Sequence, residues 1–273
     1  FIRSWEIVAR LVREAVEDAV NDNIHYMDLR FTPVALTRLS GMTIPQAMEL
    51  VSHTAIEAAE ENGLILKLVP SVNRHEPLDY AEQVIRTAVD MMGGIVAAVD
   101  LAGDEANHKA DRFIPLFNEA RQAGLDIQIH AGEWAGAGNV RQAVEEFGSK
   151  RIGHGIRVVE DLSVMKIAKD AGAVFEVCPS SNYLSGAVTD EKEHPIRFML
   201  TAGLKTTINT DDPSICDITL SDEIGITRKG IGLSAAEIQT CMQNAANASY
   251  MAETEKVSYL NELNSSLIKM ENE

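Results

Sequence analysis

The chain has 273 residues, of which 45% are hydrophobic and 24% are charged, a composition typical of a globular protein with a sizeable core. Its net charge of −17, from 24 basic and 41 acidic residues, argues against nucleic-acid binding, because an acidic protein repels phosphate backbones. No apolar run approaches the length of a membrane helix, so we expect no membrane contact. The three cysteines form no CxxC pair, and this favours a reduced, cytoplasmic setting.

A short apolar run, a polar turn and a helix of period 3.6 form a unit that recurs along the chain. Seven of the apolar runs are predicted to be strands, and the segments around them are predicted to be helices. The predicted strands cover residues 25–31, 64–72, 95–101, 125–129, 151–153, 173–178 and 205–209. The predicted helices cover about residues 4–20, 43–61, 77–93, 112–123, 139–147, 161–170, 194–202 and 235–252, with one more before the C-terminus.

Alternating strands and helices imply parallel strands with right-handed crossovers, in either an open doubly wound sheet or a closed barrel. The distribution of polar residues favours the barrel, because His130, His154 and Asp211 each lie at a strand end. In a (β/α)8 barrel these ends converge on one face, where active sites are built. We therefore predict an α/β protein in which residues 1–273 form a single TIM-type (β/α)8 barrel domain. Since Phe1 is itself predicted to lie in a helix, we expect the first strand to be missing from the chain as given.

The strand-end residues His130, His154 and Asp211 are candidate ligands of a divalent metal ion, and zinc is the first candidate. A set of nitrogen and oxygen donors is typical of catalytic zinc sites, whereas structural zinc sites are rich in sulfur. Such a metal lowers the pKa of a bound water to about 7. Glu133 lies three residues after His130 and is placed to act beside the metal as an acid or base. Asp212 adjoins Asp211 and is placed to contact a polar heterocycle.

Each of these residues also has an ordinary structural interpretation. His130 can be a buried histidine bonded to a backbone carbonyl, and residues 211–213 can form a turn, since Asp and Pro are common in turns. Asp104 and Glu105 are interpreted partly as charges at a helix N-terminus, and Cys178 as a small buried hydrophobe. Chance explains poorly why all the candidates fall on one end of a barrel. The remaining histidines are expected to be surface or core residues: His25, His53, His75, His108 and His194.

Six segments, in a fixed order, cover nearly the whole chain: 27–33 (MDLRFTP), 100–105 (DLAGDE), 130–133 (HAGE), 151–155 (RIGHG), 176–182 (EVCPSSN) and 208–213 (INTDDP). In these segments and their order the chain resembles the adenosine deaminases of the adenosine/AMP deaminase family of metal-dependent hydrolases. The resemblance implies zinc-dependent hydrolytic deamination of adenosine, and of 2′-deoxyadenosine, to inosine and ammonia in purine salvage. It also implies that the small-molecule partner is a purine nucleoside.

The resemblance implies roles for the matched residues. His130 and Asp211 resemble the zinc ligands, and Glu133 resembles the residue that donates a proton to N1 of the purine. His154 resembles the residue that orients the reacting water and helps to deprotonate it. In the family this water attacks C6 of the purine and ammonia leaves. Protonation of N1 removes charge from the ring as the water oxygen adds, so the two roles are chemically consistent.

The resemblance further implies that the backbone of Gly103 donates to the purine ring and that Asp212 contacts N7. One feature of the family is absent, because the His-x-His of its first strand, which supplies two further zinc ligands, occurs nowhere in these 273 residues. For the complete enzyme, the resemblance implies one zinc ion per chain. Residues 1–273 alone are expected to bind zinc poorly, to be inactive and to aggregate.

Two other functions are compatible with the sequence. The chain can be a deaminase of adenine or of modified adenosines, although the segment at residues 102–105 favours adenosine, by resemblance only. It can also be a non-catalytic, truncated barrel that binds a nucleoside or a protein partner. Retention of Glu133, His154, Asp211 and Asp212 argues against this last function.

Overall fold

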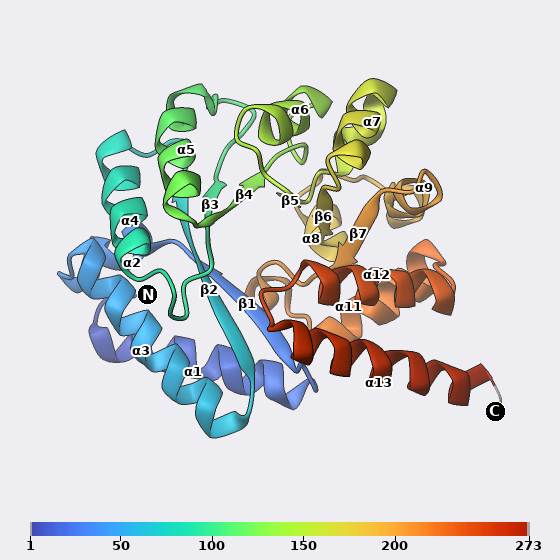
Figure 1. The fold of residues 1–273 in the computed structure, drawn as a ribbon, viewed down its shortest axis with the longest axis horizontal. Helices are drawn as coiled ribbons and strands as arrows, with labels where there is room; N and C mark the ends of the chain where they lie inside the picture. Colours follow the sequence, from blue (N-terminus) through green and yellow to red (C-terminus); the bar gives the residue numbers. More distant parts are fainter. Residues whose placement is uncertain (1, 272–273) are drawn as a thin grey trace.

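Seven parallel strands form one sheet that curls like part of a barrel, with helices around it (Figure 1). The computed structural model describes residues 2–271, with side chains to residue 265. The strands pair in sequence order, and among the described residues β1 and β7 each pair on one side only. Their bounds are β1 Tyr26–Phe31, β2 Ile65–Asn73, β3 Ala98–Ala102, β4 Asp126–His130, β5 Arg151–Gly153, β6 Val174–Val177 and β7 Lys205–Ile208.

All seven predicted strands are present, and the predicted TIM-type α/β fold is confirmed. The largest difference lies in the third strand, which was predicted from residue 95 and begins at Ala98, because Val96 makes only isolated bridges to its neighbours. The expectation drawn from Phe1 falls on a residue outside the described range. That residues 1–273 form a single domain stays a prediction.

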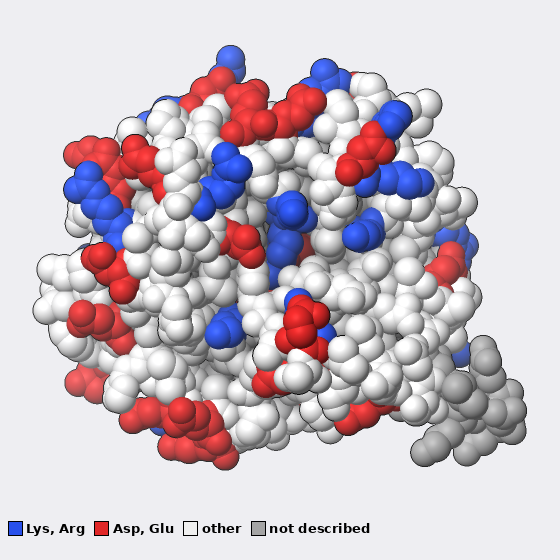
Figure 2. All heavy atoms as spheres, viewed as in Figure 1, with Lys and Arg blue, Asp and Glu red and all other residues white. Residues whose placement is uncertain are grey.

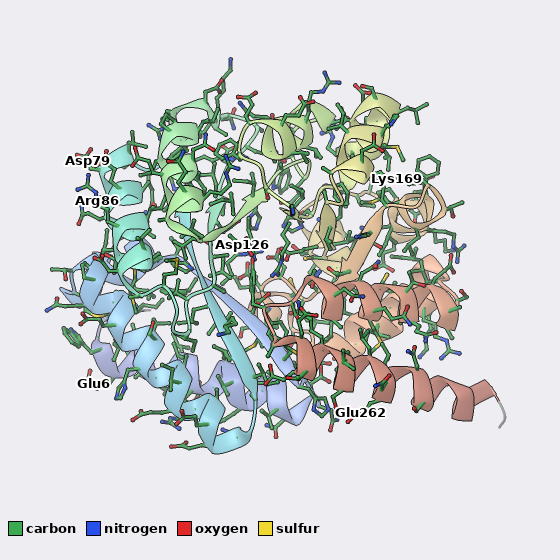
Figure 3. All side chains as sticks on the ribbon, in the orientation of Figure 1. Glu6, Asp79, Arg86, Asp126, Lys169 and Glu262 are labelled. Carbon is green, nitrogen blue, oxygen red and sulfur yellow. The ribbon has the colours of Figure 1, made fainter. Side chains whose placement is uncertain are left out.

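Helices lie around the outside of the curled sheet (Figure 1), and those packed against it bury apolar residues, as α4 does with Val84 and Ile85. The core between the two layers includes Ile129 and Phe175. The polar sides point outward, as Asp79 and Arg86 show on α4 (Leu78–Asp90; Figure 3). The other α-helices are α1 Trp5–Asn21, α2 Pro33–Ser40, α3 Ile44–Asn62, α5 Ile114–Ala123, α6 Ala137–Glu145, α7 Leu162–Asp170, α8 Pro179–Leu184, α9 Ile196–Thr201, α10 Pro213–Cys216, α11 Leu220–Ile226, α12 Ala235–Ala248 and α13 Glu253–Glu271, with short 3₁₀ or π turns η1 Asp111–Phe113, η2 Ile156–Glu160, η3 Glu191–Glu193 and η4 Thr227–Ile231. No described helix has the length and apolar character needed to span a membrane.

Three short helices begin with a proline shortly after a strand: α2 at Pro33, α8 at Pro179 and α10 at Pro213. From the sequence, strands were expected to end before these prolines and a turn was considered at residues 211–213, but no helix was expected to start at any of the three. Proline suits the first position of a helix, because its missing N–H would have no partner there and its φ is already helical. Two of these helices, α8 and α10, follow the strands that lead into the candidate site.

The inside of the curled sheet carries charged side chains, where a barrel more often carries branched apolar ones. Arg30 on β1 donates at 2.6 Å to Gln128 on β4 and at 2.6 Å to Glu176 on β6. Arg151 on β5 pairs with Asp28 on β1 at 2.7 Å and donates to Glu176 at 2.6 Å. These bonds cross from β1 to β4, β5 and β6, so the sheet must curl. Removing one partner of a buried pair costs about 3–5 kcal/mol, so this network holds the strands in place.

Acidic side chains also mark the outer surface. On the face shown in Figure 2 they gather in several groups along the edges of the molecule, in keeping with the net charge of −17.

Candidate active site

A cavity of about 550 Å³ opens where β3, β4, β5 and β7 end. Its walls come from the segments that follow these strands, including residues 102–107 after β3 and the turn after β4. Carboxyl ends of parallel barrel strands converge on one face, and this explains why segments far apart in sequence meet here. Every site residue predicted from the sequence lines this cavity: Gly103, His130, Glu133, His154, Asp211 and Asp212.

Three side chains of types that can bind a metal ion meet in the cavity. One ligand atom each from His130, His154 and Asp211 lies within 4.8 Å of the others. His130 is the last residue of β4, whereas His154 and Asp211 stand just beyond β5 and β7 with positive φ angles of 57° and 58°. Such angles are uncommon outside glycine and often mark functional positions. The cluster offers nitrogen and oxygen donors, the kind of set that a divalent ion such as zinc accepts.

Asp100 orients the first of these histidines. Its carboxylate is fully buried on β3 and lies 3.0 Å from Nδ1 of His130, while Ser71 donates to its other oxygen at 2.9 Å. Burial alone would lower the pKa of His130, but the charge of Asp100 outweighs it and raises that pKa. When Nδ1 of His130 donates its hydrogen bond to Asp100, Nε2 of His130 carries no hydrogen and its lone pair is free to bind a metal. Carboxylate partners of this kind fix the tautomer of metal-binding histidines.

Glu133 lies in the turn after β4, with its side chain only 11% exposed. Its Oε2 is 3.5 Å from Nε2 of His154, and Oε1 accepts from Asn182 at 3.4 Å and from Ser185 at 3.5 Å. Burial raises the pKa of Glu133 to about 7, and the nearby charge of Asp211 adds to the rise. A carboxyl group with such a pKa can hold and release a proton near neutral pH.

Glu105 has a different role from the one expected, because residues 105–107 form a turn and no helix begins directly after it. Its carboxylate accepts from the backbone N–H groups of residues 132–135, at 2.6 to 3.0 Å, and from Asn139 Nδ2 at 2.9 Å. Burial acts to raise the pKa of Glu105, but these five donors outweigh it and lower that pKa. Glu105 therefore anchors the turn that carries Glu133. Asp104 caps its own turn through the N–H groups of Ala106 and Asn107.

Gly103 and Asp212 complete the predicted set. Gly103 has φ 86°, and a side chain there would meet the backbone nitrogen of Arg74 at 3.1 Å, so the position requires glycine. Asp212 stands at the N-cap position of α10 without a side-chain capping hydrogen bond, and burial together with the charge of Asp211 raises its pKa. Cys178 is buried, and burial raises the pKa of its thiol, as suits the structural role predicted for it.

Helix α8 supplies contacts that the sequence analysis did not assign. Ser181 donates to Asp211 Oδ2 at 2.7 Å. Asn182, which is fully buried, reaches both Glu133 and His154 Nδ1, the latter at 3.1 Å. The only signal in the sequence was their place in the segment EVCPSSN, to which no individual roles were attached.

The chain is similar to known proteins over most of its length. The family model described as adenosine deaminase matches residues 1–266. Similar proteins include the adenosine deaminase of Erwinia tasmaniensis, 34% identical over 93% of this chain and 76% of the relative, and that of Serratia proteamaculans, 34% identical over 92% and 75%. An adenine deaminase structure from Arthrobacter aurescens superposes with a TM-score of 0.90 at 25% identity, over 97% of this chain and 80% of that one. A zinc-bound amidohydrolase structure from Burkholderia ambifaria, at 24% identity, TM-score 0.89 and coverage of 97% and 76%, shares the fold.

Proposed function

Since this chain belongs to the adenosine deaminase family, we propose that its cavity hydrolyses adenosine, and 2′-deoxyadenosine, to inosine and ammonia with the help of zinc. The protein is an aminohydrolase of this family. The observation that carries the proposal is the meeting of His130, Glu133, His154 and Asp211 in one cavity. As its setting we propose the cytoplasm, and as its small-molecule partner a purine nucleoside.

His130 and Asp211 would hold the zinc ion. Asp100 leaves Nε2 of His130 free, and Ser181 holds the carboxylate of Asp211, so both ligands are oriented before a metal arrives. When bound, zinc supplies a water that loses its proton near neutral pH. The resemblance assigns the remaining ligands to a His-x-His that these 273 residues do not contain.

Glu133 would act as the acid that protonates N1 of the purine. Its burial and its pKa of about 7 keep a share of it protonated near neutral pH. Addition of an oxygen at C6 places negative charge on the ring, and a proton at N1 neutralises that charge. His154, at 3.5 Å from Glu133 and 3.8 Å from Asp211, would orient the attacking oxygen. The backbone of Gly103 and the carboxylate of Asp212 would hold the ring beside them.

Steady-state assays with adenosine, adenine and a 6-N-methylated adenosine test this proposal on the zinc-loaded, full-length protein. We expect adenosine to give the highest kcat/KM, and His130→Ala to abolish both zinc binding and turnover. Adenine is the second candidate substrate, because a solved adenine deaminase shares the fold over 97% of this chain. A higher kcat/KM for adenine would replace the first proposal by the second.

A further inference from the structure

Two histidines and an asparagine form a continuous hydrogen-bonded row that ends in the cavity. His194 follows η3, and its Nε2 lies 3.3 Å from Oδ1 of Asn182 on α8. Asn182 Nδ2 in turn lies 3.1 Å from Nδ1 of His154. All three side chains are buried, with relative exposures of 4% for His194, 0% for Asn182 and 3% for His154. Only Nε2 of His154, at the end of the row, faces the site.

The direction of every bond in this row follows from its first member. The backbone N–H of Ile196 can only donate, and it donates to Nδ1 of His194 at 3.2 Å. Nδ1 of His194 therefore carries no hydrogen, so the neutral ring carries it on Nε2. That N–H donates to Oδ1 of Asn182, which leaves the NH₂ group of Asn182 pointing at His154. Nδ1 of His154 must then accept, and the neutral ring carries its hydrogen on Nε2.

A reversed amide of Asn182 would not satisfy the same neighbours. It would turn an NH₂ group toward the Nε2–H of His194, so that two donors would face each other, and its oxygen toward the carboxylate of Glu133. In the observed orientation the two N–H bonds of Asn182 reach two acceptors, His154 Nδ1 and Glu133 Oε1, the latter at 3.4 Å. Every polar atom of the side chain then has a partner, as a buried amide requires.

We propose that His194 and Asn182 are positioning residues that hold His154 in the tautomer with its hydrogen on Nε2, so that His154 donates a hydrogen bond in the site. The Nε2–H points toward Glu133 Oε2 at 3.5 Å and Asp211 Oδ2 at 3.8 Å. His154 is thus separated in role from His130, whose carboxylate partner produces the opposite tautomer. Only the catalytic consequence of this inference rests on the proposed function, since the tautomer itself follows from the contacts.

Burial supports the neutral state of the His194 ring, because it lowers the pKa of His194 to about 4.

Nitrogen NMR of the full-length protein with ¹⁵N-labelled histidine tests the proposal, because ring nitrogens with and without hydrogen have different chemical shifts. In the unaltered protein, with and without zinc, His154 should show hydrogen on Nε2 and none on Nδ1. A hydrogen on Nδ1 of His154, or a zinc-shifted Nε2, would overturn the proposal without any variant. Because this readout needs no turnover, an Nε2–H tautomer in a protein that leaves adenosine unchanged would refute the proposed function alone.

Asn182→Asp should reverse the tautomer, since a carboxylate can only accept and Nδ1 of His154 must then donate to it. A wrong histidine tautomer lowers kcat by about 10⁴-fold in a serine protease, so we expect a loss of about 10²–10⁴-fold here, with zinc retained. His194→Gln is the second variant, and it should leave His154 in a mixture of tautomers. Asn118→Asp on α5 and His53→Gln on α3 are matched controls away from the site and should change neither tautomer nor kcat. If His154 keeps its tautomer in the folded Asn182→Asp or His194→Gln variant, the proposed positioning of His154 by this row is contradicted.

Discussion

Replacing Glu133 by glutamine should make the metal-free protein relatively more stable as the pH rises. The buried carboxyl has a pKa of about 7 against an ordinary value of 4.5, so the folded state binds more protons than the unfolded state between these values. The contribution of Glu133 to the free energy of unfolding of the unaltered protein therefore falls as the pH rises from 4.5 to 7. The side chain is only 11% exposed, and a shift of this size corresponds to about 3 kcal/mol. The amide of the Glu133→Gln variant is neutral throughout this range, so the variant avoids this loss.

Urea unfolding of both metal-free proteins between pH 5 and pH 8 measures the effect. The free energy of unfolding of Glu133→Gln minus that of the unaltered protein should increase as the pH rises. The test is this change with pH, not the value of the difference at any one pH. In the zinc-loaded enzyme the same variant should keep its metal and lose kcat by about 10²–10⁴-fold, as expected for a lost general acid. Glu119→Gln, on the exposed face of α5, is the control. A pH-independent difference, or near-normal kcat, would refute the reasoning about Glu133.

The remaining predictions concern single contacts. Asp211→Ala should lower zinc content, whereas Asp212→Ala should keep zinc and weaken purine binding; equal metal loss in both would show that their roles are not divided. Glu105→Gln should speed hydrogen exchange of the four backbone amides that Glu105 holds and lower kcat by up to about 10²-fold with zinc retained, and unchanged exchange would contradict the anchoring role. Gly155→Ala should lower Tm at a cost of about 1–3 kcal/mol, because φ is 64° and the new Cβ would overlap the ring of Phe175; an unchanged Tm would contradict this.

Most of the fold was predictable because its signals are local. Short apolar runs bounded by glycine, proline and polar turns mark the seven strands, and Thr43 with Gln46 forms a capping box at the start of α3. The helices that were missed are also explained locally. Pro179 follows a predicted strand and Pro213 ends a predicted turn, but a proline can also open a helix, and a helix of four to six residues is too short to show a period.

The residues that line the cavity were predictable because chemically distinctive side chains stood at strand ends. Their supports were not, because these depend on which segments meet in space. Glu105 reaches a turn 27 to 30 residues away, and Asn182 bonds to His154 from 28 residues away. His194 was expected to be an ordinary surface or core residue, and nothing in its neighbours in sequence indicates that it contacts Asn182. Such contacts become visible only when the folded chain brings the side chains together.

The most direct test of the account is to incubate the zinc-loaded, full-length protein with adenosine and to measure inosine and ammonia together. We predict one ammonia released for each inosine formed, with both products lost after chelation of the metal and restored by added zinc. His130→Ala should fold and yet form neither product. Undiminished deamination by the chelated protein or by His130→Ala would contradict a zinc-dependent reaction at this cavity, as would a zinc-bound, folded protein that leaves adenosine unchanged.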